Sequence, residues 1–541
     1  MVRVIGGSFV LSQRSEAGLA YAFHRRFNLK RLGFALGLFI GICLLARTAS
    51  QSDYDQPFRP QFHFSPRVHW TNDPNGLAFF DGEYHLFYQY NPFGDVWGHM
   101  SWGHAVSHDM LHWSELPVAL PEQDGVMIFT GSTVVDEHNS SKFCKDNKPC
   151  MVAVYTGYTA AKGATKSLQT QNVAYSNDKG RTWTKYAGNP VLDLQMTDFR
   201  DPKVFWSEQG KHWVMAVSLP DDHKVRIYGS PDLKTWKTLS EFGPAGATGG
   251  QWECPELFPL PLEGKAGQQR WVMKVGLNPG GRAGGSGEQY FIGNFDGNAF
   301  KNDNPAAQTL WTDYGKDCYC ALTFSGLPKN QTQVMIGWMS NWQYADKLPT
   351  NPWRGQMTLP RQLKLRETAE GIRLIQAPLD GLQTLAKGHL KMDDLDEQGL
   401  NAALAKTDLT KGHTFEFKTT VDIGSASDVG WKVLSEDGTS FTLVGFDKQA
   451  GKLYFDRTHS GDVGFSKDFP ARLDAPLHLT GKLTMDIVVD RSSVEVFANN
   501  GAVTMTDLVF PAANANGLQF YSKGGKTGKL AADLTALKST H

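Results

Sequence analysis

Two short sequence patterns alternate along most of this 541-residue chain. One is Ser-x-Asp followed by a nearby Trp, and it occurs as SHDMLHW (107–113), SNDKGRTW (176–183) and SPDLKTW (230–236). The other is an acidic residue close to Pro followed by a hairpin pattern, as in NDPNGLAFFDGEYHLFY (72–88), RDPKVFWSEQGKHWVMA (200–216) and ECPELFPLPLEGKAGQQRWVMK (253–274). A repeat of about 50–70 residues fits a four-stranded propeller blade with its loops.

The segments between these patterns have the composition of β-strands. EYHLFYQY (83–90), MVAVYTGY (151–158) and KHWVMAVS (211–218) are rich in β-branched and aromatic residues and are bounded by turn residues. No long segment with a 3.6-residue period interrupts them. The sequence therefore predicts an all-β protein, with a β-propeller of roughly five blades over residues 58–372.

The pattern changes after the propeller. Residues 373–405 carry no blade signature and are predicted to form a linker that includes a short helix. Strand patterns return over residues 406–541, with clear alternation in SVEVF (493–497). We predict a separate C-terminal β-sandwich there.

The N-terminus has the form of a targeting segment. Arg25, Arg26, Lys30 and Arg31 precede the apolar run 32–46, and small and polar residues follow it. The run is short for a membrane-spanning helix. We predict that residues 1–50 are a signal peptide, or alternatively an uncleaved signal anchor, followed by a linker. The mature protein would then be periplasmic or secreted, without a stable membrane partner after cleavage.

Charge and residue spacing argue against several other classes of function. With 54 basic and 55 acidic residues the chain has no excess charge to attract nucleic acid. His104, His108 and His112 recur every four residues, but they lie in a strand-and-turn pattern, so no metal site is predicted. The GGRAGGSG run (280–287) lacks the Lys and the helix of a phosphate-binding loop, and no cofactor is expected.

The cysteines fit an oxidising compartment. Cys144 and Cys150 flank a short polar loop and are predicted to be able to form a disulfide. Cys318 and Cys320 are too close in sequence for an easy bridge to each other. Cys254 is predicted to be a small buried packing residue.

The second repeat carries the candidate chemistry. Asp73, Asp201 and Glu253 occupy equivalent points of three repeating units. Equivalent strands of a propeller line its central axis, so these side chains are predicted to converge on one cavity. Carboxylates gathered in this way repel one another, which raises a pKa and lets one of them act as an acid.

Nine segments in the same order resemble glycoside hydrolase family 32, the family of invertases, levanases and inulinases. They are HFSPRVHWTNDPNGL (63–77), FYQYNP (87–92), WGHMSWGHAVSHDMLHW (97–113), FTGS (129–132), FRDPKVFW (199–206), WECPELF (252–258), DYGKDCYC (313–320), WMSNWQYADKLPTNPWRGQMTLPRQL (338–363) and SSVEVFANNGAVTMTDLVFP (492–511). The resemblance covers nearly all of the chain after the targeting segment. It implies a five-bladed propeller with an appended β-sandwich, in agreement with the repeats.

The resemblance also implies residue roles. Asp73 resembles the family's nucleophile, Asp201 its transition-state stabiliser and Glu253 its general acid/base. The family retains anomeric configuration, so the carboxyl groups of Asp73 and Glu253 are expected ~5–5.5 Å apart. The residues expected to line the fructose pocket are Asn72, Gln89, Trp97, Phe129, Thr130, Arg200 and one or both of Trp338 and Trp342. Thr71, Thr130 and Glu256 depart from the usual Met, Ser and Asp of the family, which bears on substrate preference more than on catalysis.

The implied activity is that of a retaining exo-β-fructosidase acting on a fructan or on sucrose. The segments WMSNWQYADKLPTNPWRG and ECPELF look more like bacterial exo-acting fructanases than plant invertases, which favours levan over inulin and sucrose. A sucrose invertase and a fructosyltransferase are alternatives within the family. A non-catalytic fructan-binding protein is the alternative from another class, and the three carboxylates argue against it.

Overall fold

The computed structural model describes residues 51–161 and 166–541. The predicted signal segment therefore lies outside the described residues. Within the described part of the chain, no helix combines the length and apolar character needed to cross a membrane. Strands dominate this part, and one short α-helix, α1 (Glu397–Leu404), accompanies them.

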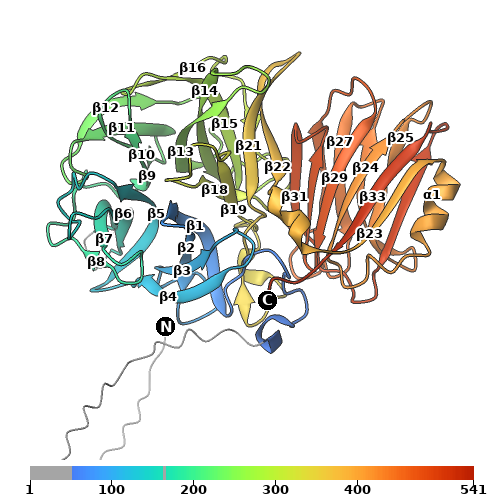
Figure 1. Cartoon of the computed structure of the whole chain (residues 1–541), viewed down its shortest axis with the longest axis horizontal. Coiled ribbons are helices and arrows are strands. Elements are labelled where there is room, and N and C mark those ends of the chain that lie inside the picture. The colour runs from blue at the N-terminus through green and yellow to red at the C-terminus, as the bar shows by residue number, and fades with distance from the viewer. Residues whose placement is uncertain (1–50, 162–165) are drawn as a thin grey trace, which may run out of the picture. The chain divides into compact units, whose positions relative to one another are not determined.

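Five sheets form the blades of a propeller (Figure 1). Strand pairing within them is mainly antiparallel, and each sheet runs outward from its first strand. The first two blades contain β1 (His69–Phe80), β2 (Glu83–Asn91), β3 (Ser101–Ser107) and β4 (Ser114–Leu120), then β5 (Val126–Asp136), β6 (Cys150–Thr159), β7 (Leu168–Ser176) and β8 (Thr184–Lys185).

The other three blades follow in chain order. The third contains β9 (Arg200–Ser207), β10 (His212–Leu219), β11 (Lys224–Ser230) and β12 (Lys237–Phe242). The fourth contains β13 (Gln251–Pro261), β14 (Gln269–Asn278), β15 (Gly287–Phe295), β16 (Phe300–Asn302) and β17 (Leu310–Trp311). The fifth contains β18 (Tyr319–Thr323), β19 (Val334–Trp338), β21 (Arg361–Thr368) and β22 (Gly371–Pro378).

The innermost strands close into a ring around the propeller axis. Each of β1, β5, β9 and β13 contacts the next, and β18 contacts both β13 and β1 (Figure 1). A bridge between Ala78 and Ser325 joins the first and last blades, and β20 (Trp353–Arg354) pairs in parallel with β1. The prediction of a five-bladed propeller is confirmed.

The Ser-x-Asp repeat is the turn between the third and fourth strands of the first three blades. In the first, the Asp109 carboxylate accepts backbone N–H bonds from Leu111 and His112, and Trp113 donates its indole N–H to the Met110 carbonyl. The equivalent bonds recur around Asp178 and Asp232 in the next two blades. Side-chain acceptors thus satisfy turn amides, as local Asp motifs do.

Apolar side chains pack mainly between neighbouring blades. Trp252 lies between the third and fourth blades with Phe242 and Phe291, and it is fully buried. Similar clusters separate the other blades. Large aromatic side chains fill the space between neighbouring blades with few residues, which accounts for the aromatic-rich composition.

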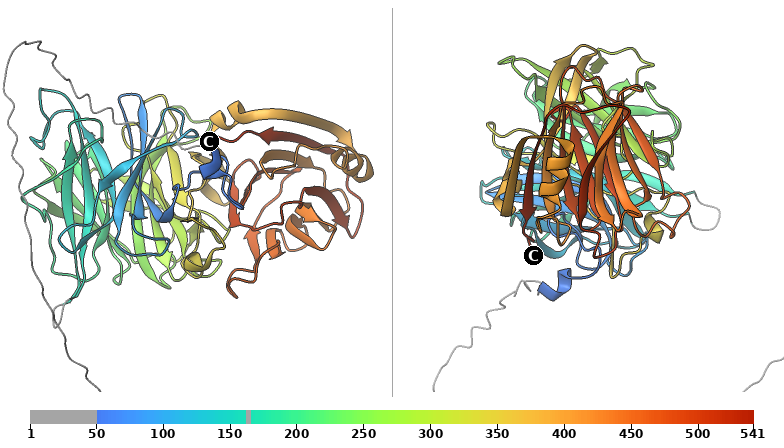
Figure 2. Two further views of the ribbon diagram at one scale, coloured as in Figure 1. Left: turned by 90° about the horizontal axis from the view of Figure 1, so that it is seen from below. Right: turned by 90° about the vertical axis from the view of Figure 1, so that its right-hand side faces the viewer.

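Two sheets after the propeller form a β-sandwich, seen from two further directions in Figure 2. One contains β23 (Ala386–Leu395), β33 (Leu530–Leu537), β24 (Phe415–Val421), β29 (Leu483–Asp490), β30 (Ser493–Ala498) and β31 (Val503–Leu508). The other contains β28 (Arg472–Pro476), β27 (Lys452–His459), β26 (Ser440–Asp447), β25 (Asp428–Glu436) and β32 (Gly517–Lys523). Their facing side chains form one apolar cluster.

The range 373–405 contains the short helix predicted there, α1, but the prediction that it is a linker is wrong. Most of β22 lies in this range and pairs with β21 as the outer strand of the fifth blade. The range also contains β23, which pairs with β33 at the edge of the sandwich, and helix α1. Between β22 and β23, the connection is a short 3₁₀ turn, Asp380–Leu385.

A row of buried charges links the propeller to the sandwich. The His63 ring lies between two sandwich carboxylates, with Nδ1 2.9 Å from Asp490 Oδ2 and Nε2 2.7 Å from Glu495 Oε1. Glu495 also pairs with Arg361 of the fifth blade, and Arg361 Nη1 lies 3.0 Å from Asp313 Oδ2. These five residues, which we call the interdomain charge cluster, alternate in sign and are almost fully buried.

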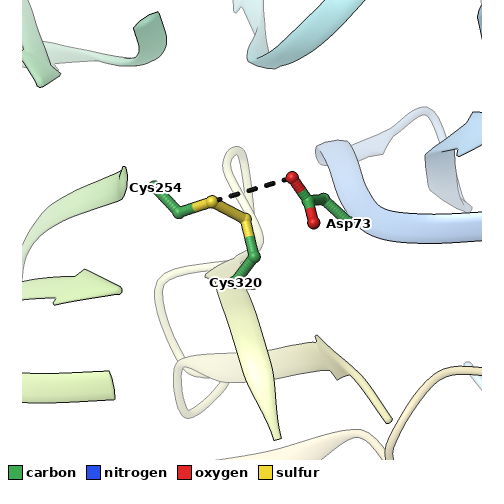
Figure 3. A group of neighbouring side chains, drawn as sticks. All are labelled: Asp73, Cys254 and Cys320. Atoms are coloured by element: carbon green, nitrogen blue, oxygen red, sulfur yellow. Dashed lines mark hydrogen bonds between the residues drawn. A yellow bond between two sulfur atoms is a disulfide. The ribbon is translucent and has the colours of Figure 1, made fainter. Parts of the chain in front are cut away.

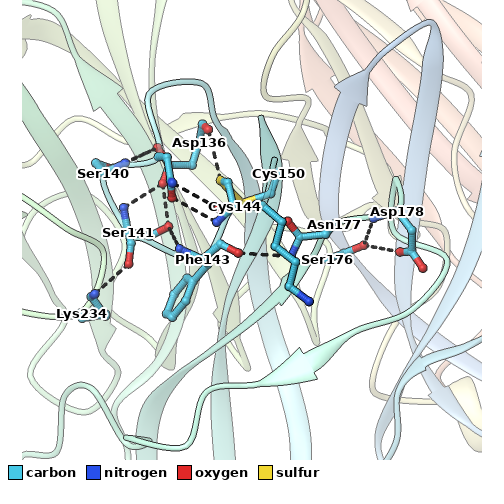
Figure 4. Close-up of a disulfide and its surroundings, with 12 residues drawn as sticks. Asp136, Ser140, Ser141, Phe143, Cys144, Cys150, Ser176, Asn177, Asp178 and Lys234 are labelled. Atoms are coloured by element: carbon cyan, nitrogen blue, oxygen red, sulfur yellow. Dashed lines mark hydrogen bonds between the residues drawn. A yellow bond between two sulfur atoms is a disulfide. The ribbon is translucent and has the colours of Figure 1, made fainter. Parts of the chain in front are cut away.

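A disulfide joins Cys144 and Cys150, the pair whose spacing allowed a bridge (Figure 4). Cys150 begins β6 at the end opposite Tyr158, which reaches the central cleft described below. This disulfide therefore closes a peripheral loop, remote from the axis of the propeller.

Candidate active site

Every inner strand of the propeller has a β-bulge near its start. The pairing register shifts between Thr71 and Pro74, Ile128 and Gly131, Arg200 and Lys203, Glu253 and Glu256, and Tyr319 and Leu322. A bulge leaves residues unpaired and re-aims their side chains. Five bulges at one end of a closed ring therefore turn a set of side chains toward a shared cleft.

The bulges refine the expected equivalence of the three acidic residues. Asp201 is the first unpaired residue of its bulge, Asp73 is the second, and Glu253 is the paired residue just before its bulge. Relative to the place of Asp201 in its bulge, Asp73 lies one position later and Glu253 one position earlier. The three acids are therefore not at the equivalent points that the repeats predicted. The predicted convergence is correct, because all three side chains line one cleft.

The cleft has a volume of about 340 Å³. Its walls come from the first four blades and from the segment that follows β19. The lining residues are Asn72, Asp73, Gln89, Trp97, Phe129, Thr130, Tyr158, Gln169, Asp198, Arg200, Asp201, Glu253, Asn278 and Trp342. Acids, amides and aromatic rings together are the side chains that bind sugar hydroxyls and the C–H face of a sugar ring.

Asp73 is buried, and its carboxylate has a single close hydrogen-bond donor. Thr130 Oγ1 donates to Asp73 Oδ2 at 2.6 Å, whereas Asp73 Oδ1 has no partner. Burial raises the pKa of Asp73 to about 6, and the nearby charge of Glu253 acts in the same direction. A buried carboxylate oxygen without a partner is costly, and its place at a cleft makes Asp73 a candidate functional group.

Asp201 and Glu253 share the region around Arg200. The backbone N–H of Cys254 donates to Asp201 Oδ2 at 2.9 Å, and Arg200 Nε donates to Glu253 Oε1 at 3.0 Å. Burial raises the pKa of Asp201 to about 7 against the opposing charge of Arg200, and the charges of Glu253 and Asp73 add to the rise. With Asp73 and Asp198, four acids line the cleft beside one arginine, so the cluster holds excess negative charge.

Seven of the eight predicted binding residues line the cleft, and Trp338 does not. Trp338 is fully buried and packs beneath Trp342, with ring centroids 4.8 Å apart. It supports Trp342, which faces the cleft. At the rim, Trp97 is 44% exposed and packs edge-on against Phe129.

Several site residues were not found from the sequence. Tyr158 stacks on Phe129, and Asp198 and Gln169 both accept hydrogen bonds from Arg200. Tyr319 donates its hydroxyl to Glu253. The DYGKDCYC motif contained Tyr319, and the position of this motif at the start of a strand was the signal that could have identified it.

A second disulfide joins Cys254 to Cys320 beneath the cleft (Figure 3). The prediction that Cys254 is a packing residue is therefore incomplete, since it is also covalently bonded to the neighbouring blade. Asp73 Oδ2 lies 3.8 Å from Cys254 Sγ, so these three residues cluster closely. The two sulfurs are bonded to each other and do not offer thiolate ligands to a metal.

A five-bladed propeller with three acidic side chains in its axial cleft has the groups that sugar-bond cleavage requires, and the fold and site define a glycoside hydrolase. Residues 63–378 match the N-terminal domain of glycosyl hydrolases family 32, and residues 382–538 match the C-terminal domain of that family. The chain belongs to glycosyl hydrolase family 32.

Individual relatives cover most of the chain. A levanase of Bacillus subtilis (strain 168) is 45% identical over 494 residues, which span 90% of this chain and 72% of the levanase. An extracellular exo-inulinase of Aspergillus niger is 42% identical, over 93% of this chain and 98% of its own. The crystal structure of exo-inulinase from Aspergillus awamori superposes with a TM-score of 0.83 at 40% identity, covering 90% of this chain and 100% of that one.

Proposed function

We propose that this protein is a retaining exo-β-fructosidase that releases fructose from β-fructans, with levan as the preferred polymer and inulin and sucrose as further substrates. The observation that carries the proposal is the trio of Asp73, Asp201 and Glu253 around one cleft. Two relatives of the protein are named as a levanase and an exo-inulinase, which supports fructans as the substrate class.

Asp73 is proposed to be the nucleophile. Its Oδ1 has no hydrogen-bond partner, so this oxygen is free to attack an anomeric carbon, while Thr130 fixes Oδ2. Attack would form a covalent fructosyl–enzyme intermediate, which water then hydrolyses. Asp73 must be ionised for this step, and its raised pKa makes it a better proton acceptor than a free carboxylate but restricts activity at low pH.

Glu253 is proposed to be the general acid/base. Its side chain is partly exposed, whereas Asp73 is buried, so Glu253 can reach both the leaving oxygen and the incoming water. It would protonate the leaving oxygen as an acid and then deprotonate water as a base. Asp73 and Glu253 line the same cleft, and the charge of Glu253 acts on Asp73, so the two carboxylates are near neighbours, which supports a retaining geometry.

Asp201 is proposed to stabilise the oxocarbenium-like transition state through fructose hydroxyls. The backbone N–H of Cys254 holds its carboxylate. Bonds from this group to the sugar would strengthen as positive charge develops on the ring. Export to the periplasm or the medium is part of the proposal and rests on the N-terminal sequence and on the extracellular relative.

Chromatography of the products from levan, inulin and sucrose tests the proposal. Fructose alone from levan, released faster than from inulin or sucrose, is the expected result. A ladder of oligomers would indicate endo-cleavage, and products longer than the donor would indicate a fructosyltransferase. Faster release from sucrose than from either polymer would indicate an invertase. Fructan binding without any product would indicate a binding protein.

A further inference from the structure

The Cys254–Cys320 disulfide links two blades directly beneath the proposed catalytic groups. Cys254 follows Glu253 on β13, and Cys320 follows Tyr319 on β18. Both sulfur-bearing residues are buried, with exposed fractions of 1% and 0%. The same two strands are joined again just above, where the Tyr319 hydroxyl donates to the Glu253 carboxylate.

Both cysteines occupy the same place in their bulges. Each is the first unpaired residue, and each has a positive φ, 47° at Cys254 and 45° at Cys320. Residues other than glycine rarely adopt this conformation and keep it only where the surroundings impose it. Asp201, the first unpaired residue of its own bulge, has the same conformation with a φ of 67°, so the conformation belongs to the bulges, and the disulfide covalently joins two of them.

Cys254 also contacts the other two carboxylates of the site. Its backbone N–H donates to Asp201 at 2.9 Å, and its Sγ lies 3.8 Å from Asp73 Oδ2 (Figure 3). The carboxylates around it repel one another, and one cation, Arg200, faces them. A shift of this residue would therefore disturb the positions of all three acids.

We propose that the Cys254–Cys320 disulfide is a positioning element for the reaction, which holds the bulge that follows Glu253 against the bulge that follows Tyr319. The inference rests on the proposed role of Glu253 as the acid/base. Misplacement of a catalytic group by about 1 Å can cost 10²-fold in rate, so a constraint on this bulge has a large effect.

The test compares two disulfide-free variants. The first is Cys254→Ala/Cys320→Ala, and the matched control is Cys144→Ala/Cys150→Ala, which removes the peripheral disulfide. Peptide mapping of the wild type first checks that both bonds are present, and free thiols at Cys254 and Cys320 would overturn the inference. Both variants are expected to unfold at lower temperature, so stability alone does not distinguish them.

Two substrates provide the mechanistic readout. Sucrose needs a proton on its leaving oxygen, whereas 4-nitrophenyl β-fructofuranoside has a leaving group that departs without one. We expect kcat/KM of Cys254→Ala/Cys320→Ala to fall at least about tenfold more on sucrose than on the aryl fructoside, because displacement of Asp73 and Asp201 affects both substrates, whereas loss of acid assistance affects sucrose alone. Equal losses on both substrates, or no loss, would overturn the positioning role.

A second test asks whether the disulfide acts by maintaining the hydrogen bond between Tyr319 and Glu253. Tyr319→Phe is measured in the wild type and in the Cys254→Ala/Cys320→Ala background. If the disulfide acts by holding the Tyr319–Glu253 contact, the two losses on sucrose are not additive. Additive losses would mean that the disulfide does not act through this contact.

Reduction provides a second route if the alanine pair does not fold. In the Cys144→Ala/Cys150→Ala protein, the described residues retain a single disulfide. Dithiothreitol transfers two electrons and two protons to it, which gives thiols at Cys254 and Cys320 and cyclic oxidised dithiothreitol. The same selective loss on sucrose is expected. Fructose release by the wild type without any selective loss would overturn this inference alone, whereas no release by the wild type would overturn the proposed function.

Discussion

The active-site cluster and the interdomain charge cluster are both buried sets of acids around an arginine, yet they are balanced differently. In the cleft, Arg200 faces Asp198, Asp201 and Glu253, while Asp73 adds a fourth carboxylate, one oxygen of which has no partner. In the interdomain charge cluster, His63 lies between Asp490 and Glu495, and Arg361 lies between Glu495 and Asp313.

The pKa values follow this balance. Burial raises the pKa of Asp73 to about 6 and of Asp201 to about 7, because too few cations oppose it. At the interface, burial also acts against the charge of Glu495, but Arg361 and His63 overcome it and lower the pKa to about 2. Burial and excess negative charge thus make Asp73 and Asp201 easier to protonate than free carboxylates, whereas paired charge keeps Glu495 ionised and links the two domains.

Neutralising an acid in the cleft should give the largest effect. Asp73→Asn and Glu253→Gln are each expected to lower kcat/KM on sucrose by about 10³-fold or more, since each removes a proposed reacting group. The melting temperature should not fall in Asp73→Asn, because this change removes a buried charge that lacks a full set of partners. Retention of a tenth of the activity in either variant would contradict its role.

Removing a cation from the interdomain charge cluster should lower stability and leave activity nearly unchanged, the reverse of the effect expected in the cleft. Arg361→Met leaves Glu495 and Asp313 buried without their main partner, and we expect a loss of about 3–5 kcal/mol in the free energy of unfolding. Urea unfolding measures the loss, and kcat of the folded enzyme should change little. Lys211→Met, at an exposed ion pair with Glu208, is the control and should change nothing measurable. An equal result for the two variants would contradict the comparison.

The hydrogen bond from Thr130 is expected to control the ionisation of Asp73 in the cleft. This bond lowers the pKa of that acid, so Thr130→Ala should raise this pKa further above 6. Because Asp73 must be ionised, the acid limb of the kcat/KM profile should move to higher pH, and activity at pH 5 should fall about tenfold for every pH unit that the limb moves. Thr130→Ser keeps the donor and should retain the wild-type limb. An unmoved limb in the alanine variant would separate Thr130 from the ionisation of Asp73.

The pH dependence of stability should give the smallest effect. Burial opposes the charge of His63, but bonds to Asp490 and Glu495 raise its pKa from 6.5 to about 9. This stabilisation is complete below pH 6.5 and is lost as the pH rises through 9. The contribution of Glu495 is present above pH 4.5 and is lost as the pH falls through about 2.

Calorimetry of His63→Gln tests this alkaline loss. The variant should melt at a lower temperature than the wild type at pH 6, and the difference should shrink toward pH 10. His99→Gln, at an exposed ring beside Glu122, is the matched control and should show a constant difference. A constant difference for His63→Gln as well would show that its charge does not stabilise the interface.

Sequence reasoning succeeded where the signal is local and repeated. The Ser-x-Asp turns bind their own backbone around Asp109, Asp178 and Asp232, so their pattern survives in the sequence. It failed for β23, whose side chains are mostly exposed and whose apolar alternation is limited to Leu390 and Met392. That strand forms through backbone pairing with β33, more than a hundred residues later. It also missed the offsets among Asp73, Asp201 and Glu253, because an unpaired bulge residue leaves no mark on a sequence pattern.

The sequence by itself determined the family, the all-β architecture and the identity of the three acids, since each depends on residues close together in the chain. Only the tertiary structure decided which groups surround those acids. Cys320 reaches Cys254, and Tyr319 reaches Glu253, because the fourth and fifth blades are neighbours in a closed ring and their bulges begin at the same level. Contacts across 66 residues of chain follow from blade order and strand register, which no local pattern encodes.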